Sequence, residues 1–477
     1  MNAETADLSS GQGVPFSQAA VVLRALCRNV VNKTSRASKR SNRVANRGYA
    51  RMETKLRDAM NVVSEDEIVD LESRMVAIPS YTTEESELAE FIADYLNDNR
   101  VEVGLQRVPF PNNTKSSLPR SYNVVGRIHG TADGPSLMFN GHMDHGPLDG
   151  RNSDDLSGWT RPPFRATIED GYLYGKGCQD EKGGICAMLI AAVTMRRLNL
   201  HPRGDLIVTP VCGHKSYSAG SRHLIESGLR ANMVINTENS GNAIVPVHVG
   251  VLTATVDIEG AHPHPTQRKR YPSLALEPPP FDRVIRFLQA LGPESTPYKP
   301  GGWLRYPPHP VLKDFPWHHV DKVESHGFVR KTVHLWYHVP PGVTEESLRQ
   351  DLERLSARLA ETDRGFRTTV KTRAYGPALE TPWDCPLVKS LARCYSKVTG
   401  DDACVSAEPR YGLYGDASVF SEAGMTSVVF GPGGGFTDLD YEWRVLQRLV
   451  PPDERIRIRD LIVAARVCSL VAIDVSA

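Results

Sequence analysis

The segment SLMFNGHMD, residues Ser136–Asp144, decides the fold class of this chain. Residues 136–140 form a short apolar run typical of a buried β-strand, and Gly141 ends it just before His142 and Asp144. Residues two apart on a strand point the same way, so His142 and Asp144 would share a face. In open α/β folds, ligands gather at the carboxyl edge of the sheet, where this pair would lie. An imidazole beside a carboxylate suits a divalent transition metal, although a His-x-Asp pair alone is a weak signal.

Strand-like and helix-like segments alternate around this stretch. The predicted strands are Tyr122–Ile128, Asp205–Val211, Met233–Asn236 and Thr426–Phe430; the predicted helices include Gly183–Leu198, Ser221–Ser227 and one that begins at Ser64. Such alternation favours a mixed α/β sheet with helices on both faces.

The pattern changes after His248. A strand at Val249–Glu259, a helix at Phe281–Leu291, a strand at Thr332–His338, a helix capped by Thr344 and a strand at Phe366–Arg373 describe a small α+β unit. We therefore predict a basic N-terminal extension (1–60), a catalytic domain in two parts (61–247 and 375–477), and an inserted lid or dimerisation domain (248–374).

Composition excludes several classes of protein. The chain has 477 residues, 40% of them hydrophobic, so it is neither collagen-like, coiled-coil nor wholly disordered. Lys+Arg and Asp+Glu both number 56, and a chain without net positive charge is not expected to coat nucleic acid. We see no secretory signal, no membrane-spanning stretch and no CxxC spacing, and we expect a cytoplasmic protein. The basic extension is interpreted as an arm for an acidic partner or as a solvated extension.

A second motif follows the first, at Trp159–Gly184. Its glycines allow close backbone approach, and Asp180 lies where the following helix begins. An acid at that point could hold a cation. Alternatively, Asp180 only caps the helix.

Taken together, the motifs resemble the M20 family of zinc aminoacylases, deacetylases and carboxypeptidases. The matching segments are Gly141–Asp144, Trp159–Gly184, the strand that leads to Glu238, Gly260–His264, Gly415–Ala417 and Gly431–Gly433.

The resemblance implies a catalytic domain with two zinc ions about 3.5–4 Å apart and a lid that often dimerises. It assigns His142, Asp180 and Glu238 to one metal. It also implies that a lid histidine, His264 (with His262 as its competitor), reaches the substrate, and that Gly433 lines the pocket.

The second metal is where this sequence departs from the family. The family has two consecutive glutamates, a general base and a zinc ligand, where this chain has His214 and Lys215. The last zinc ligand of the family is a histidine four residues before a glutamate. Counting back from Glu442 gives Asp438, which we place among the substrate-binding residues. We expect one zinc ion, or another divalent metal ion in its place, per chain, with the Lys215 ammonium paired with Asp180 in place of the second ion.

The sequence therefore predicts a metal-dependent enzyme that acts on an amide or related C–N bond of a small amino-acid-derived substrate, as a homodimer through the lid. Asp144 would orient His142, while His214 and Lys215 would supply proton transfer and positive charge. Two alternatives stay open: a repurposed biosynthetic enzyme (cyclisation, acyl transfer or elimination), and a pseudo-peptidase that only binds. The sequence does not identify the substrate.

Overall fold

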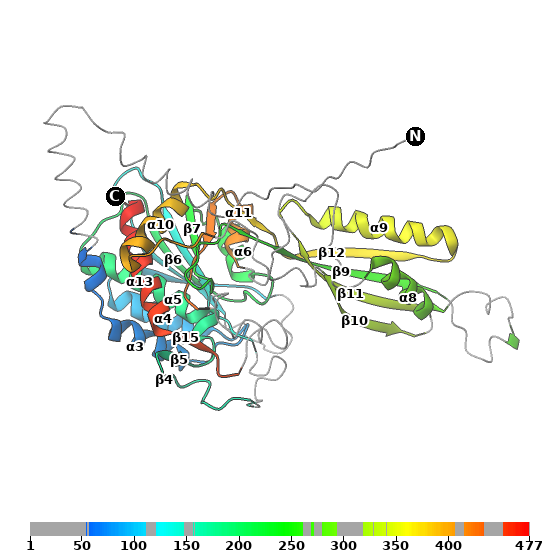
Figure 1. Ribbon diagram of the computed structural model, residues 1–477, viewed down its shortest axis with the longest axis horizontal. Helices are drawn as coiled ribbons and strands as arrows, with labels where there is room; N and C mark the ends of the chain where they lie inside the picture. The colour runs from blue at the N-terminus through cyan, green and yellow to red at the C-terminus, as the bar shows by residue number, and fades with distance from the viewer. Residues whose placement is uncertain are drawn as a thin grey trace, which may run out of the picture. The chain divides into compact units, whose positions relative to one another are not determined.

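A six-stranded mixed sheet organises the larger part of the chain (Figure 1). Its strands lie in the order β1 (Glu102–Arg107), β2 (Tyr122–Ile128), β6 (Leu206–Val211), β3 (Leu137–His142), β7 (Met233–Asn236) and β14 (Thr426–Val429). The four strands from β6 to β14 are parallel to one another, and β2 pairs antiparallel with both β6 and β1. The computed structural model describes residues 54, 57–110, 121–146, 156, 158–260, 269–270, 279–292, 318–327, 329–339, 341–405, 415–433 and 452–476.

Helices cover both faces of this sheet, which explains why every residue of β3 and β6 is buried. On one face, α5 (Gly183–Arg197) packs against α13 (Ile458–Ser476). On the other face, α6 (Ala219–Glu226) and α11 (Ala417–Glu422) contribute Leu224 and Phe420, which pack with Met138, Ile207 and Val234 of the sheet. The predicted α/β architecture is confirmed.

Further helices and two small sheets complete this part of the chain. These are α3 (Glu65–Val76), α4 (Ser86–Asp98), α10 (Pro386–Thr399), the pair β8 (Val247–His248) with β13 (Leu379–Glu380), and the sheet β15 (Arg455–Arg457), β5 (Tyr172–Tyr174) and β4 (Thr167–Glu169). Helix α3 begins where the sequence predicts, because the Ser64 hydroxyl accepts a hydrogen bond from the Glu67 backbone N–H at 3.1 Å.

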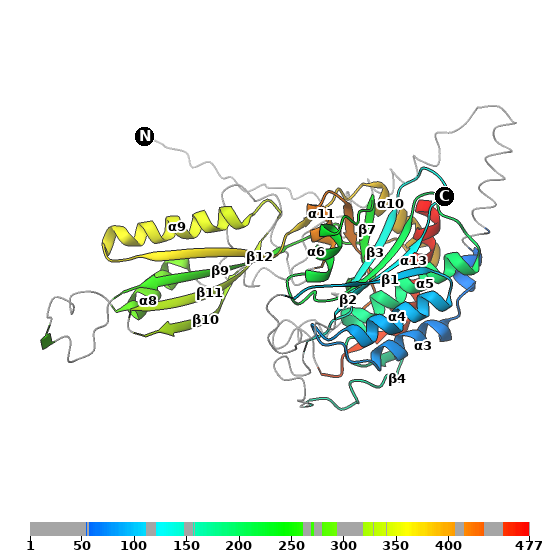
Figure 2. The ribbon, with the colours of Figure 1, turned by 180° about the vertical axis from the view of Figure 1, so that it is seen from behind.

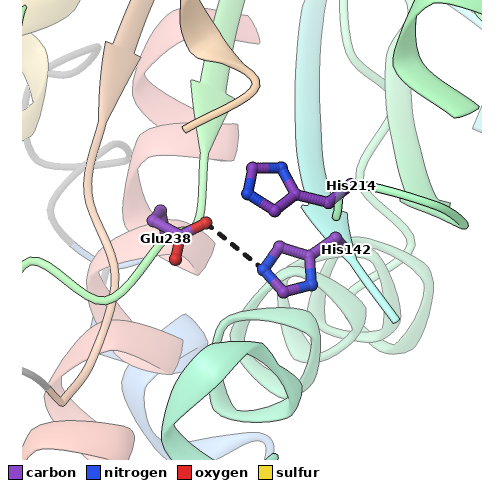
Figure 3. A group of neighbouring side chains, drawn as sticks. All are labelled: His142, His214 and Glu238. Carbon is purple, nitrogen blue, oxygen red and sulfur yellow. Dashed lines mark ion pairs between the residues drawn. The ribbon is translucent and has the colours of Figure 1, made fainter. Parts of the chain in front are cut away.

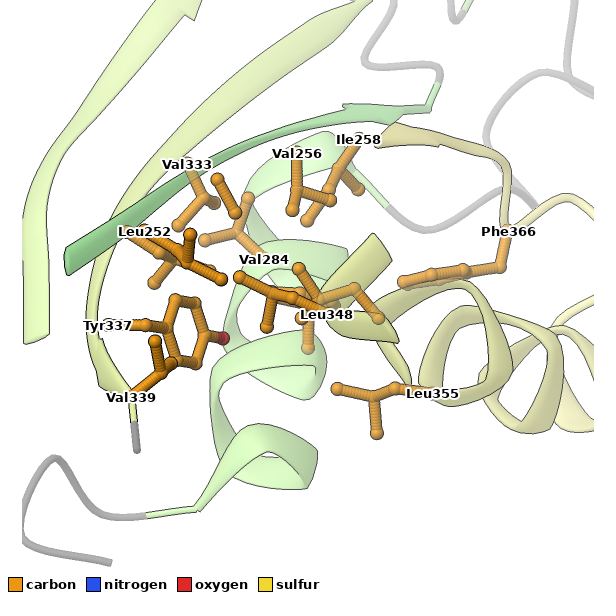
Figure 4. Packing of buried hydrophobic residues seen from close by; sticks show 14 residues of the cluster. Leu252, Val256, Ile258, Val284, Val333, Tyr337, Val339, Leu348, Leu355 and Phe366 are labelled. Atoms are coloured by element: carbon orange, nitrogen blue, oxygen red, sulfur yellow. The ribbon is translucent and has the colours of Figure 1, made fainter. Parts of the chain in front are cut away.

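A second, antiparallel sheet has the order β10 (His318–His326), β11 (Arg330–Val339), β9 (Gly250–Glu259) and β12 (Thr368–Gly376). Helices α8 (Pro280–Leu291) and α9 (Glu345–Thr362) lie on one face of it, as Figure 2 shows from behind. Their shared core includes Leu252, Val256, Val284, Val333 and Leu348 (Figure 4).

Strand β10 corrects the sequence analysis, which predicted three strands in this unit. The segment is polar and lies at the sheet edge, so it lacks the apolar alternation that marks a half-buried strand. Its His318 is 3% exposed and stacks on Tyr337.

The residue limits of the predicted domains stay predictions, and nearly all of the basic extension lies outside the described residues. Among the helices that the structure describes, none has the length and apolar character needed to cross a bilayer.

Candidate metal centre

His142 stands at the carboxyl end of β3, in the middle of the large sheet. The residue before it must be small. A Cβ atom on Gly141 would lie 2.6 Å from the Thr237 hydroxyl oxygen and 2.7 Å from the Glu181 carboxylate. Glycine therefore lets the Glu181 carboxylate reach the strand, where it accepts a hydrogen bond from the His142 backbone N–H at 3.0 Å.

The imidazole of His142 is held in one tautomer. Its Nδ1 lies 2.8 Å from the backbone carbonyl oxygen of Asp144. Because a carbonyl only accepts, Nδ1 carries the proton, and in the neutral ring Nε2 presents a lone pair to the site. Asp144 thus orients His142, as the sequence suggested, but mainly through its main chain. The Asp144 carboxylate oxygen is 3.6 Å from Nδ1.

The Asp144 carboxylate instead organises the turn that follows β6. Its two oxygens accept hydrogen bonds from the backbone N–H groups of His214 at 2.9 Å and Lys215 at 3.1 Å. The Thr82 hydroxyl donates a further hydrogen bond at 2.9 Å. One buried acid therefore fixes both His142 and the His214–Lys215 turn.

Three buried polar atoms meet at this point, His142 Nε2, Asp180 Oδ1 and Glu238 Oε2, and among the described residues they have no hydrogen-bond partner outside this group. His142 Nε2 is 3.0 Å from Asp180 Oδ1 and 3.6 Å from Glu238 Oε2, an ion pair drawn in Figure 3. Leaving such atoms unpaired is costly, so a group of this kind calls for a ligand. One imidazole nitrogen and two carboxylate oxygens fit a divalent cation such as zinc.

The electrostatics of this pocket favour positive charge. Burial lowers the pKa of His142, and so does the neighbouring Lys215. The carboxylates of Glu238 and Asp180 outweigh both effects and raise this pKa to about 9. The same field would attract a cation.

The His214 ring stacks on the His142 ring, with ring centroids 4.4 Å apart and an angle of 7° between the planes (Figure 3). One nitrogen of each ring and a Glu238 oxygen lie within 4.8 Å of one another. An ion in the plane of the His142 ring cannot also lie in the parallel plane of the His214 ring. The parallel stacking thus favours one of the two rings, not both, as a ligand of a single ion.

A buried acid, Asp416, holds the His214 ring at its Nδ1 edge. Nδ1 lies 2.7 Å from Asp416 Oδ1, and the Ser221 hydroxyl donates to Asp416 Oδ2 at 2.5 Å. Burial raises the pKa of Asp416, but His214 and these hydrogen bonds hold it well below its usual range. Asp416 therefore stays ionised and fixes the orientation of the His214 ring through Nδ1.

Lys215 makes the ion pair that the sequence suggested. Its Nζ lies 3.4 Å from Asp180 Oδ2. Burial lowers the pKa of Lys215, but Asp180 and Asp144 overcome this effect and raise it above the usual value. Asp180 thus presents one oxygen to Lys215 and the other to His142.

With this geometry in view, comparison with known proteins identifies the family. A model described as peptidase family M20/M25/M40 matches residues 138–473. The chain belongs to this family.

Relatives of this M20 chain include N-formyl-4-amino-5-aminomethyl-2-methylpyrimidine deformylases. That of Halalkalibacterium halodurans is 25% identical over 345 residues, covering 66% of this chain and 76% of the relative. That of Bacillus subtilis is 25% identical over 407 residues, covering 77% and 87%. A probable succinyl-diaminopimelate desuccinylase of Staphylococcus epidermidis is 29% identical over 207 residues, covering 43% of this chain and 47% of the relative.

Solved structures of low identity show the same fold. Aminopeptidase PepT from Bacillus cereus has a TM-score of 0.64 at 15% identity, covering 87% of this chain and all of its own. The M20 family metallo-carboxypeptidase Sso-CP2 from Sulfolobus solfataricus has a TM-score of 0.63 at 17% identity, covering 86% and 99%.

The remaining predicted site residues of this M20 chain are placed only in part. Gly433 has a φ of +75°, and a Cβ atom there would lie 2.6 Å from the Gln179 side chain. It therefore lies against the turn that carries Asp180. His264 and Asp438 lie outside the described residues.

Sequence reasoning missed two acids beside the site. Asp416 lies in the quoted segment Gly415–Ala417, but nothing in the sequence pairs it with His214. Glu181 follows Asp180 directly and is 1% exposed. It accepts hydrogen bonds from the His142 backbone and from the Thr237 hydroxyl at 2.9 Å, and burial raises its pKa to about 8.

Proposed function

We propose that this chain is a one-metal M20 hydrolase that cleaves the amide C–N bond of a small N-acyl substrate. The observation that carries this proposal is the meeting of His142 Nε2, Asp180 Oδ1 and Glu238 Oε2, all buried and, among the described residues, without a hydrogen-bond partner outside this group. Three protein ligands and an open position are usual for a single catalytic zinc.

Two features support one ion rather than two. Lys215 brings an ammonium to within 3.4 Å of Asp180, the acid that bridges two ions in the family. The family's last histidine ligand also has no counterpart, because no histidine follows His338 in the entire chain. A second ion would therefore meet a positive charge and too few ligands.

The residues around the site fit the roles that amide hydrolysis requires. A bound divalent ion would polarise the amide carbonyl and lower the pKa of water. His214 Nε2 would accept the proton of the attacking water and return it to the leaving nitrogen, while Asp416 holds Nδ1. The Lys215 ammonium adds positive charge where negative charge develops on the carbonyl oxygen.

The relatives support an N-acyl amine as the substrate class. Two of them are deformylases and one is a probable desuccinylase, so their names share the removal of an acyl group from nitrogen. In the proposed reaction, water adds to the acyl carbon, the C–N bond breaks, and a carboxylic acid and an amine are released.

We also infer a homodimer through the unit that contains the second sheet. Large hydrophobic side chains are exposed there on one side of α8, with Phe281 at 54% and Ile285 at 43%. Side chains four residues apart share a helix face, and an apolar face of this kind suits a second copy of the chain. Sedimentation of the wild-type protein should give a dimer and that of Phe281→Ser a monomer. A monomeric wild-type protein would contradict this inference.

The experiment combines metal content with amine release. The zinc-loaded protein is analysed for zinc per chain and incubated in ¹⁸O water with N-formyl, N-acetyl and N-succinyl derivatives of small amines. We expect one zinc per chain, free amine, and ¹⁸O in the released acid. Glu238→Gln, which keeps the shape of the side chain, should lose both zinc and activity. Amine release without ¹⁸O incorporation would identify acyl transfer instead, and no reaction with any derivative would contradict the hydrolase.

A further inference from the structure

A short segment near the C-terminus, Asp453–Arg457, contacts both the turn that carries Asp180 and strand β5. Its last three residues form β15, which pairs with β5. Just before β15, the Glu454 carboxylate points into η1 (Cys178–Lys182), the helical turn that presents Asp180.

Glu454 accepts hydrogen bonds from three backbone N–H groups of the loop that leads to the site. One carboxylate oxygen accepts from Gly177 at 2.9 Å. The other accepts from Gln179 and from Asp180 itself, both at 3.1 Å. The Glu454 backbone carbonyl also accepts from Gly175 at 2.8 Å. The direction of the Asp180 main chain is therefore set by a residue 274 positions later in the sequence.

These bonds are made inside the protein. Glu454 is 2% exposed, and Lys176, also 2% exposed, has its Nζ 3.7 Å from the Glu454 carboxylate. Hydrogen bonds from backbone N–H groups to an ionised carboxylate are among the stronger ones, and water does not compete for them here. The carboxylate thus fixes the turn more firmly than a neutral side chain would.

The neighbouring acid provides an internal comparison. Asp453 accepts hydrogen bonds from the backbone N–H groups of Thr160 at 2.9 Å and Arg161 at 3.1 Å. Asp453 therefore holds a backbone segment by accepting hydrogen bonds, as Glu454 does. The segment that it holds supplies none of the proposed metal ligands.

We propose that Glu454 is a positioning residue for the metal centre: by holding the backbone at Gly177, Gln179 and Asp180, it aims the Asp180 carboxylate at the ion. This inference rests on the proposed function, in which Asp180 is a metal ligand. The carboxylate of Glu454 does not itself touch the ion or the substrate.

The test compares the zinc affinity of two variants, measured by competition with a chromophoric chelator well below their unfolding temperatures. In Glu454→Gln, an amide NH₂ replaces one acceptor oxygen and faces backbone N–H donors. We expect about 10- to 100-fold weaker zinc binding, the range typical of residues that orient a ligand. Asp453→Asn should lower the unfolding temperature but bind zinc as the wild type does. Equal zinc affinity in Glu454→Gln and the wild type would overturn the inference, as would equal weakening in both variants.

Two further measurements separate the inference from the proposed function. If Asp180→Asn binds zinc as tightly as the wild type, the ligand set itself is wrong. If Asp180→Asn loses zinc and Glu454→Gln does not, only the positioning role fails. Hydrogen exchange of the wild-type protein needs no variant: zinc should slow exchange at 177–180 and leave 160–161 unchanged. Unchanged exchange at 177–180 would also count against the role of Glu454.

Discussion

Lys215 Nζ lies 3.4 Å from Asp180 Oδ2, while the other oxygen of Asp180 lies 3.0 Å from His142 Nε2. A single carboxylate therefore connects an ammonium on one side with the proposed metal ligand on the other. In a two-metal enzyme, a bridging acid faces a cation on both sides. In the proposed one-metal site, the Lys215 ammonium would take the place of the second cation, and its charge could not be lost by dilution or chelation.

Replacing Lys215 by methionine should tighten zinc binding about tenfold, because it removes a positive charge beside a ligand of the ion. The chain should still bind one zinc, since no additional ligand is created. Titration with a competing chelator measures the affinity. Lys215→Arg retains the charge and should bind zinc as the wild type does. Weaker zinc binding in Lys215→Met would contradict the assignment of Asp180 as a ligand.

Replacing His214 by alanine should reduce turnover by about 10²- to 10⁴-fold, the usual contribution of a general base. The ion should remain bound, because the stacked ring is not among its proposed ligands. Steady-state kinetics and zinc analysis of the same preparation measure both quantities. Unchanged turnover would remove His214 from the mechanism, and loss of zinc would make it a ligand.

Asp416→Asn tests the acid that contacts His214 Nδ1. Its amide can present NH₂ instead of oxygen to His214 Nδ1, which disturbs the ring tautomer. It should lower kcat with little change in KM, because Asp416 contacts the base and not the substrate. A normal kcat would show that the contact between Asp416 and His214 is structural only.

The buried elements of the fold could be predicted from sequence because their patterns are local. The strands at Tyr122–Ile128 and Met233–Asn236 have the predicted bounds. The second is marked by a short apolar run, which is typical of a buried strand. Strand β10 could not be predicted in this way. Its residues are mostly polar, and its place depends on pairing with β11, which no local pattern records.

The candidate site also contains residues that sequence motifs predict and contacts that they do not. His142, Asp180 and Lys215 lie in ordered motifs, and the structure brings them together. The contacts of Asp416 with His214 and of Glu454 with Asp180 span 202 and 274 residues. Such pairs arise only when the sheet assembles, so neither composition nor spacing could reveal them.

Replacing Asp363 by asparagine should destabilise the smaller sheet and its helices by about 3 kcal/mol. The Arg283 guanidinium is 1% exposed, and its Nε and Nη2 donate to the two Asp363 oxygens at 2.7 and 2.8 Å. The substitution leaves this buried charge without its partner. Urea unfolding followed by tryptophan fluorescence measures the loss. Glu346→Gln, which breaks an exposed ion pair with Arg349, should leave the midpoint unchanged.

Stability should fall as the pH is lowered from about 6.5 to about 4, in part because of His248. Burial lowers the pKa of this histidine from 6.5 to about 4. Within that window the unfolded chain binds a proton that the folded chain does not, so the free energy of unfolding decreases by up to roughly 3 kcal/mol. Above pH 6.5 this contribution is constant.

His248→Asn keeps a donor near the position of Nδ1, which donates to the Val249 carbonyl oxygen, but cannot be protonated. Its unfolding free energy should therefore decrease less steeply over the same range of pH. Parallel curves for the wild type and the variant would show that His248 is not responsible for the difference.

The most direct test of the central claim is anomalous diffraction at the zinc edge from crystals grown with excess zinc. We predict one peak per chain, in contact with His142 Nε2, Asp180 and Glu238, and none beside Lys215. Two peaks in the site, or no peak at these three residues, would contradict the account.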